Sequence, residues 1–247
     1  AAPTRPPRAT LRPTISTHEP TVQPTLAPTA SFSPTATPTT VPIRILLQEI
    51  IFEAAPASYS NLLTQGTSQN RALNWLASED DVLTLIDGPP EKVVQRWALA
   101  TVFYATNGQD WYQLAGWLTS SDECDWFFRT DRGNTCNNDG YIEILDLEDN
   151  NLSGSIPDEI GLFGSAIRIL SFIDNTIAGA IPSAIGRLVS LERLELTRNE
   201  LDGPIPTEVG ELRQLSKFTN SDRIRDFCTC PYIPLCWCCC RVSAQPS

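Results

Sequence analysis

Three stretches of the chain repeat one another: LDLEDNNLSGSIPDEIG at residues 145–161, LSFIDNTIAGAIPSAIG at 170–186 and LELTRNELDGPIPTEVG at 194–210. Their first leucines are 25 and then 24 residues apart. Self-similarity at such a period is the sequence signature of a solenoid, in which successive coils of backbone stack on one another. An asparagine, a glycine and a proline recur in register: Asn150, Asn175 and Asn199; Gly154, Gly179 and Gly203; and Pro157, Pro182 and Pro206.

Each shared position has a physical role in such a coil. In the LxLxxN segment, the two leucine positions alternate on a short strand and point inward, and the asparagine turns the chain. We expect the asparagine amides to bond to backbone groups of the next coil, because a dry core offers no water as a partner. The glycine allows backbone angles that a Cβ forbids, and the proline fixes the return segment. One coil cannot cover its own apolar face, so the array needs neighbours and capped ends.

The pattern LxxLxLxxNxLxGxIPxxIGxL resembles the plant-type extracellular leucine-rich repeat, with three full matches and a partial fourth. The resemblance extends upstream, because ALATVFYATNGQDWYQLAGWL from residue 98, CDW at 124–126 and then Cys136 are similar to that family's cysteine-containing N-terminal cap. It implies an α/β solenoid over residues 142–220, preceded by a cap over residues 106–141. It also implies a scaffold that binds proteins, peptides or cell-wall polysaccharide, without naming the ligand.

The eight cysteines fall into two groups. The resemblance implies a disulfide between Cys124 and Cys136, and closing a loop of that size stabilises by roughly 3 kcal/mol in the chain-entropy model. The other six lie within FCTCPYIPLCWCCC, in a tail over residues 221–247 that we expect to be irregular. That run lacks the spaced pairs and histidines typical of zinc sites. Three interpretations of these six cysteines remain open: S-acylation, a cysteine-rich extracellular end with mixed disulfide bridges, and a truncated or misread end.

Residues 1–42 have the composition of a disordered stalk. They hold ten of the 20 prolines and eleven threonines, in runs such as SPTATPTT. Proline favours extended backbone, and this segment has no apolar periodicity that could form a core. Threonine and serine beside proline are typical of O-glycosylated stalks, and an unmodified flexible tail is the alternative.

Residues 43–105 predict several helices, from apolar side chains at helical spacing. The strongest is EKVVQRWALATVFYAT at residues 91–106, entered through Pro89 and Pro90. We interpret the helices as an extended cap over the first coil, with an independent ligand-binding helical domain as the alternative. On the strongest helix we expect Val93, Val94, Trp97, Thr101 and Tyr104 to face one way.

The charge balance argues against a nucleic-acid partner. The chain has a formal net charge of -11, and because residues 1–42 are slightly basic, the remainder is more acidic still. Phosphate binding needs a basic stripe, whereas a negatively charged protein suits a cationic ligand, a wall component or a surface bridged by calcium. A merely solvated acidic surface is the alternative. No segment approaches the roughly 20 apolar residues that span a bilayer.

Nothing in the sequence favours an enzyme, a cofactor or a metal site. The one histidine, His18, lies in the stalk, so Ser-His-Asp or Cys-His catalysis has no base in the folded part. Carboxylates such as Asp146 and Asp174 could share a face, but a two-carboxylate glycosidase needs a deep cleft that a short array does not offer. Dinucleotide and phosphate-loop motifs are absent from the sequence.

In a solenoid, recognition falls to the outward strand residues, because the inward ones are committed to packing. Ile169 and Ile173 stand out as isoleucines in a polar row, which indicates an apolar contact unless the helical cap or a second chain covers one of them. Asn151 begins the triplet NLS, a candidate N-glycosylation site with an exposed side chain. The candidate ligand-binding residues are Ile144, Asp146, Glu148, Asp149, Ile169, Ser171, Ile173, Asp174, Arg193, Glu195, Thr197 and Arg198, followed by Lys217 and Thr219 on a fourth strand.

The sequence therefore predicts a secreted or cell-surface binding module that is not an enzyme, carried on a stalk. The chain begins with neither a methionine nor a signal-like segment, so we expect a removed leader or a fragment, with an anchor in a segment absent from this chain as a possibility. The alternative is a structural wall or matrix protein in which the glycosylated stalk is the working part and the repeats self-associate.

The two cysteine groups should behave differently in peptide mapping. Under non-reducing conditions we expect mass spectrometry to find Cys124 joined to Cys136, and the six C-terminal cysteines to give heterogeneous linkages. A free thiol at either Cys124 or Cys136 in protein from the native source would contradict the pairing.

Overall fold

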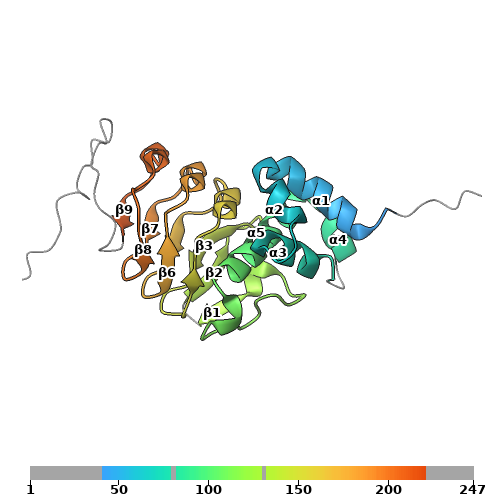
Figure 1. The fold of residues 1–247 in the computed structure, drawn as a ribbon, viewed down its shortest axis with the longest axis horizontal. Helices are drawn as coiled ribbons and strands as arrows, with labels where there is room; N and C mark the ends of the chain where they lie inside the picture. Colours follow the sequence, from blue (N-terminus) through green and yellow to red (C-terminus); the bar gives the residue numbers. More distant parts are fainter. Residues whose placement is uncertain (1–40, 79–81, 130–131, 221–247) are drawn as a thin grey trace, which may run out of the picture. The chain divides into compact units, whose positions relative to one another are not determined.

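The computed structural model describes residues 41–78, 82–129 and 132–220 of the chain. These residues form a helical region that leads into a solenoid of stacked coils (Figure 1). Apart from its last two residues, the predicted stalk over residues 1–42 lies outside the described residues, as does the predicted cysteine-rich tail over residues 221–247.

The helical region packs around one long helix, α5. Leu47 and Ile51 of the first helix and Leu73 and Leu76 of the third are fully buried, and they form one core cluster with Trp97 of α5. Two prolines open α5, because a proline at the first helical position removes only a donor that would lack a partner anyway. The helices are α1 (Ile43–Ala54), the 3-10 helix η1 (Pro56–Ser58), α2 (Tyr59–Leu63), α3 (Ser68–Leu76), α4 (Val82–Ile86) and α5 (Pro90–Ala105).

The helix α5 is buried on more than the face that the five side chains predicted from the sequence define. Every residue from Val93 to Phe103 is buried, whereas Tyr104 is only partly so. The physical reason is that α5 has partners on two sides: Trp97 and Ala100 pack with the helices, while Leu99 and Val102 belong to the core of the solenoid.

The segment between α5 and the coils forms the N-terminal end of the sheet. Strand β1 (Phe127–Arg129) pairs antiparallel with β2 (Arg132–Cys136), and β2 pairs antiparallel with the first repeat strand. The structure joins Cys124 to Cys136 by a disulfide, with the Cα atoms 5.5 Å apart. Two short 3-10 helices, η2 (Gly108–Asp110) and η3 (Glu123–Asp125), precede these strands.

A buried ion cluster fixes α5 to this segment. The Glu123 carboxylate lies 2.6 Å from Lys92 Nζ and 3.0 Å from Arg96 Nη1, and it accepts a hydrogen bond of 2.7 Å from Gln95 Nε2. Burial alone would raise the pKa of Glu123, but the hydrogen bond and positive charge of Lys92, together with Gln95, hold that pKa below its ordinary value.

The predicted solenoid is confirmed by parallel ladders at the predicted register. Leu145 pairs with Leu170, and Leu170 pairs with Leu194. The ladder continues from β2 through β3 (Ile142–Asp146), β5 (Ile169–Ser171), β7 (Arg193–Glu195) and β9 (Lys217–Thr219). Each coil also has a strand of a second small sheet, β4 (Ser153–Gly154), β6 (Thr176–Gly179) or β8 (Glu200–Leu201), and then a 3-10 helix, η4 (Asp158–Phe163), η5 (Ser183–Arg187) or η6 (Thr207–Glu211).

The repeated asparagines join the coils, although not in the direction expected. Asn175 Oδ1 accepts hydrogen bonds from the amides of Asn150 and Leu152, and its Nδ2 donates to the carbonyl of Leu147, all on the preceding coil. Asn199 bonds to the preceding coil in the same way, through Ile177 and Phe172. Bonding to the next coil was therefore the wrong expectation, because each amide turns back toward the coil that precedes it.

Gly154 shows why the repeat needs a glycine after the strand. Its φ is +90°, and an added Cβ would lie 2.3 Å from the carbonyl oxygen of Ala105, the last residue of α5. The amide of Ser155 donates to that same carbonyl. The glycine thus lets the end of α5 sit directly against the first coil.

Replacing Asn175 with alanine should destabilise the array by about 3 kcal/mol, because at least two buried amides and a carbonyl lose their partner. Urea denaturation followed by circular dichroism measures the change. Asn138→Ala is the control, since Asn138 is exposed in a turn and should change stability by less than about 0.5 kcal/mol. Equal effects of the two substitutions would show that the asparagine ladder is not what joins the coils.

The Glu123 cluster gives stability a defined pH dependence. Because the folded-state pKa of Glu123 is lowered, its contribution is present above the unfolded pKa of about 4.3 and is lost as pH falls through the folded pKa. Glu123→Gln should cost about 3 kcal/mol near neutral pH, because Lys92 and Arg96 lose their carboxylate. The difference in unfolding free energy between the wild type and this variant should be smaller in urea melts at pH 3 than near neutral pH. A difference that stays constant would contradict the assignment.

Candidate functional site

The strand face of the solenoid, formed by the outward residues of β3, β5, β7 and β9 and of the turns after them, arranges the predicted site residues in rows. Two rows are fixed by strand pairing: Ile144, Ile169, Arg193 and Lys217, and then Asp146, Ser171, Glu195 and Thr219. Backbone hydrogen bonds from Asp149 to Ile173 and from Asp174 to Thr197 continue the stacking into the turns. There the equivalent residues are Glu148, Ile173 and Thr197, and then Asp149, Asp174 and Arg198.

The residues of these rows differ in exposure. Asp149, Arg193, Arg198 and Lys217 are exposed. Ser171 and Glu195 were expected to be exposed as well, but their exposed fractions are only 3% and 7%. Ser171 is small and lies between Asp146 and Glu195 on the neighbouring strands, and Glu195 forms an ion pair with Lys217. The other members of the set, Ile144, Asp146, Glu148, Ile169, Ile173, Asp174, Thr197 and Thr219, are half-buried.

Charges on the strand face are partly neutralised within it. The Arg198 guanidinium binds the Asp174 carboxylate from the adjacent coil through both oxygens. This hydrogen bonding, assisted by the positive charge of Arg198, lowers the pKa of Asp174 despite a small opposing effect of burial. A ligand on this face therefore meets carboxylates that are already paired.

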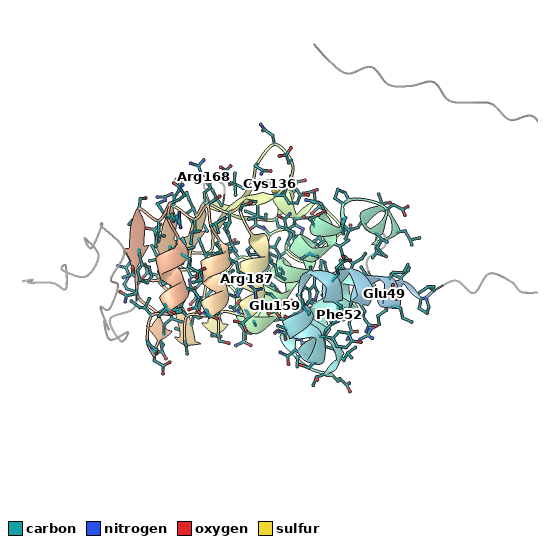
Figure 2. The ribbon with its side chains drawn as sticks, turned by 90° about the horizontal axis from the view of Figure 1, so that it is seen from above. Glu49, Phe52, Cys136, Glu159, Arg168 and Arg187 are labelled. Atoms are coloured by element: carbon teal, nitrogen blue, oxygen red, sulfur yellow. A yellow bond between two sulfur atoms is a disulfide. The ribbon has the colours of Figure 1, made fainter. Side chains whose placement is uncertain are left out.

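The sequence analysis missed a ladder of charges at the start of the strands. Arg168 donates to Glu192 and, at 3.1 Å, to Glu143, so three successive coils are linked. Figure 2 labels Arg168, which is half-exposed at this edge. The signal was present in the sequence, because residues 143, 168 and 192 are 25 and 24 residues apart, in register with the repeat.

Three isoleucines form the apolar part of the strand face. Ile144 and Ile169 are direct neighbours across the β3–β5 pair, and Ile173 follows in the turn after β5. All three are half-buried, so each keeps part of its side chain at the surface. The carboxylates of the first coil, Asp146, Glu148 and Asp149, lie on one side of them, and Arg193, Arg198 and Lys217 follow on the other, so the apolar part of the face lies between an acidic part and a part of mixed charge.

Asn151 is less exposed than expected. Its side chain is half-buried, its φ is +59°, and its Nδ2 donates a 2.7 Å hydrogen bond to the carbonyl of Asp110. Ser153, the third residue of the triplet, accepts a hydrogen bond from Asn107. The expectation of a free side chain at residue 151 was wrong because the segment before the first coil folds against this turn.

Neither a metal centre nor a membrane span is found within residues 41–78, 82–129 and 132–220. These residues contain no group of three histidine, cysteine, aspartate or glutamate side chains placed to hold a metal ion. None of the helices described there is long and apolar enough to cross a bilayer.

Comparison with known proteins also indicates leucine-rich repeats in the region of the parallel ladders. Residues 141–163 and 190–212, which are parts of the first and third repeats, match the Leucine Rich Repeat family. A search of curated proteins finds no match.

Among solved structures, the chain is similar to PEPR1 in its complex with AtPEP1, with 23% identity and a TM-score of 0.41 over 50% of this chain and 17% of that one. It is also similar to the ectodomain of the Arabidopsis receptor kinase HAESA bound to an IDA peptide hormone, with 30% identity and a TM-score of 0.31 over 32% and 13% of the two chains. For the SOBIR1 ectodomain of Arabidopsis thaliana the identity is 22% and the TM-score 0.38, over 50% and 67%. The match thus spans less than a fifth of the first two relatives.

Three lines of observation lead to the family. The repeated LxLxxNxLxGxIP pattern, the parallel ladders in its register and the match to the repeat family all concern the same residues. The coils of residues 142–220 are therefore leucine-rich repeats, and their sequence pattern resembles the plant type.

Proposed function

We propose that the chain is a non-enzymatic binding module that holds a protein or peptide ligand on its strand face. The leucine-rich repeat scaffold and the arrangement of side chains on that face support this proposal. The strand residues are fixed by ladder hydrogen bonds, so they present a rigid surface that loses little entropy on binding.

The observation that carries the proposal is the row Ile144, Ile169 and then Arg193. An apolar patch beside fixed charges has the composition of an interface centre with a polar rim. The isoleucines would supply the buried contact, while the exposed Arg193 would orient an acidic or polar part of the ligand. The paired Asp174 and Glu195 would contribute less, because their charges are already neutralised.

We also propose that the protein works outside the cell or at its surface. A disulfide such as that between Cys124 and Cys136 persists in oxidising compartments and is rare in the cytosol. The threonine-rich and proline-rich composition of residues 1–42 suits a stalk that projects the module. A glycan on Asn151 would be attached to Nδ2, the atom that donates a hydrogen bond to the carbonyl of Asp110.

Ile173→Asp tests the strand face directly. The tagged full-length chain is cross-linked to intact cells of its native source, the captured partner is identified, and the affinity of the purified pair is then measured by calorimetry. The substitution should weaken binding at least about tenfold, because it places a charge in the apolar centre of the contact. Its effect on thermal stability should be small, since the side chain is only half-buried.

Val189→Asp is the matched control, because Val189 is a 52% exposed apolar residue away from the strand face, two residues after the end of η5. It should leave the affinity unchanged. An equal loss of binding with both substitutions would refute the assignment of this face, and a large loss of stability with Ile173→Asp would show that Ile173 is a core residue. Binding of wall polysaccharide fragments to the purified chain, in the absence of any protein partner, would identify a glycan ligand instead.

A further inference from the structure

The structure contains a second candidate site, away from the strand face. A cavity of about 670 Å³ lies between η1 and the start of α2 on one side and the 3-10 helices η4, η5 and η6 of the coils on the other. Figure 2 shows Glu159 and Arg187, which line this cavity, apart from Arg168 at the strand edge. We name it the junction cavity. Its volume lies within the range of pockets that hold organic ligands.

A buried carboxylate without a counter-charge lies at the junction cavity. Glu159 is only 2% exposed, and within the described residues it forms no ion pair. Its partners are neutral: Ser58 Oγ donates at 2.5 Å to Oε1, and Gln69 Nε2 donates to both oxygens at 3.1 and 3.0 Å. Buried charges in proteins are usually paired with an opposite charge, and Glu159 has no such partner within the described residues.

The remaining lining strengthens that negative charge. Asp158, Glu208 and Glu211 also line the cavity, and the single cationic residue among the lining residues is Arg187. A cleft lined mainly by one sign of charge concentrates its field and attracts the opposite sign. The walls between the charges are small side chains such as Ala57 and Ala184, which leave room for the methylene stem of a long side chain.

We propose that the junction cavity is a binding site for a basic peptide segment, with an arginine or lysine side chain directed toward Glu159. Arginine suits the site well, because its planar guanidinium donates to two carboxylates at once. The volume is larger than a metal ion needs, and within the described residues no metal-holding group occurs. This site is separate from the strand face, so the protein would engage two ligands or two parts of one partner.

The test uses the full chain and a fluorescein-labelled Gly-Arg-Arg-Gly peptide, with binding followed by fluorescence anisotropy at low salt. The triple substitution Asp158→Asn, Glu208→Gln and Glu211→Gln should weaken binding at least about tenfold. Arg187→Gln should strengthen it several-fold, because the one cation that repels the ligand is removed. A gain of affinity cannot come from unfolding, so this second variant keeps the test valid if the triple variant folds poorly.

The matched control removes three exposed carboxylates elsewhere, by Glu49→Gln, Asp139→Asn and Asp202→Asn. It changes the net charge by the same amount and should alter the affinity less than about twofold. Equal weakening by both triple variants would show general attraction to an acidic protein and would overturn the site. An unchanged affinity with the cavity triple variant, or with Arg187→Gln, would do the same.

Three further measurements separate this site from its alternatives. Ala57→Trp, at an exposed lining residue, should block the peptide without changing charge. Spermidine should compete more weakly than unlabelled peptide, and stronger competition would identify a small polyamine site and refute the peptide assignment. Ile173→Asp should leave the peptide affinity unchanged, so failure of the strand-face proposal and failure of this one are distinguishable.

Discussion

The structure depends on hydrogen bonds between coils, because each coil has backbone amides and carbonyls that only the next coil can pair. Where the chain turns out of the strand, its amides and carbonyls face a core without water, and the asparagine of the following coil supplies both a donor and an acceptor. Asn150 shows what happens at the start of the array: it bonds to the backbone of Gln113, in the segment before the first coil. The ladder of asparagine bonds therefore begins in that segment.

The same argument explains the position of α5. The first coil exposes an apolar side to the chain that precedes it, and Leu99 and Val102 cover that side. Because α5 is also the centre of the helical region, the helices and coils share a continuous apolar interior. The ion cluster around Glu123 and the close approach of Ala105 to Gly154 fix the helix at both ends. The helical region thus has the contacts of a cap for the solenoid.

Local repetition made the coils predictable, whereas contacts between distant segments were not. The register of Leu145, Leu170 and Leu194 followed from spacing alone, because equivalent residues of stacked coils must become neighbours. The burial of Ser171 and Glu195 depended on the sizes and charges of residues on adjacent strands. The junction cavity could not be predicted from the sequence, since Ser58 and Gln69 contact Glu159 across separations of 101 and 90 residues. No period or motif relates those positions.

The two faces differ in how their charges are balanced, and this difference decides what each can recognise. On the strand face Asp174 and Glu195 already have cationic partners in the neighbouring coil, so the apolar strip of isoleucines offers the larger contact energy. At the junction cavity the buried Glu159 accepts hydrogen bonds only from the neutral donors of Ser58 and Gln69, within the described residues. Under the two proposals, an apolar ligand surface suits the first face and a cationic side chain suits the second. A packed core that includes Leu170 and Ile185 lies between the two faces, so a ligand at one face would not touch the residues of the other.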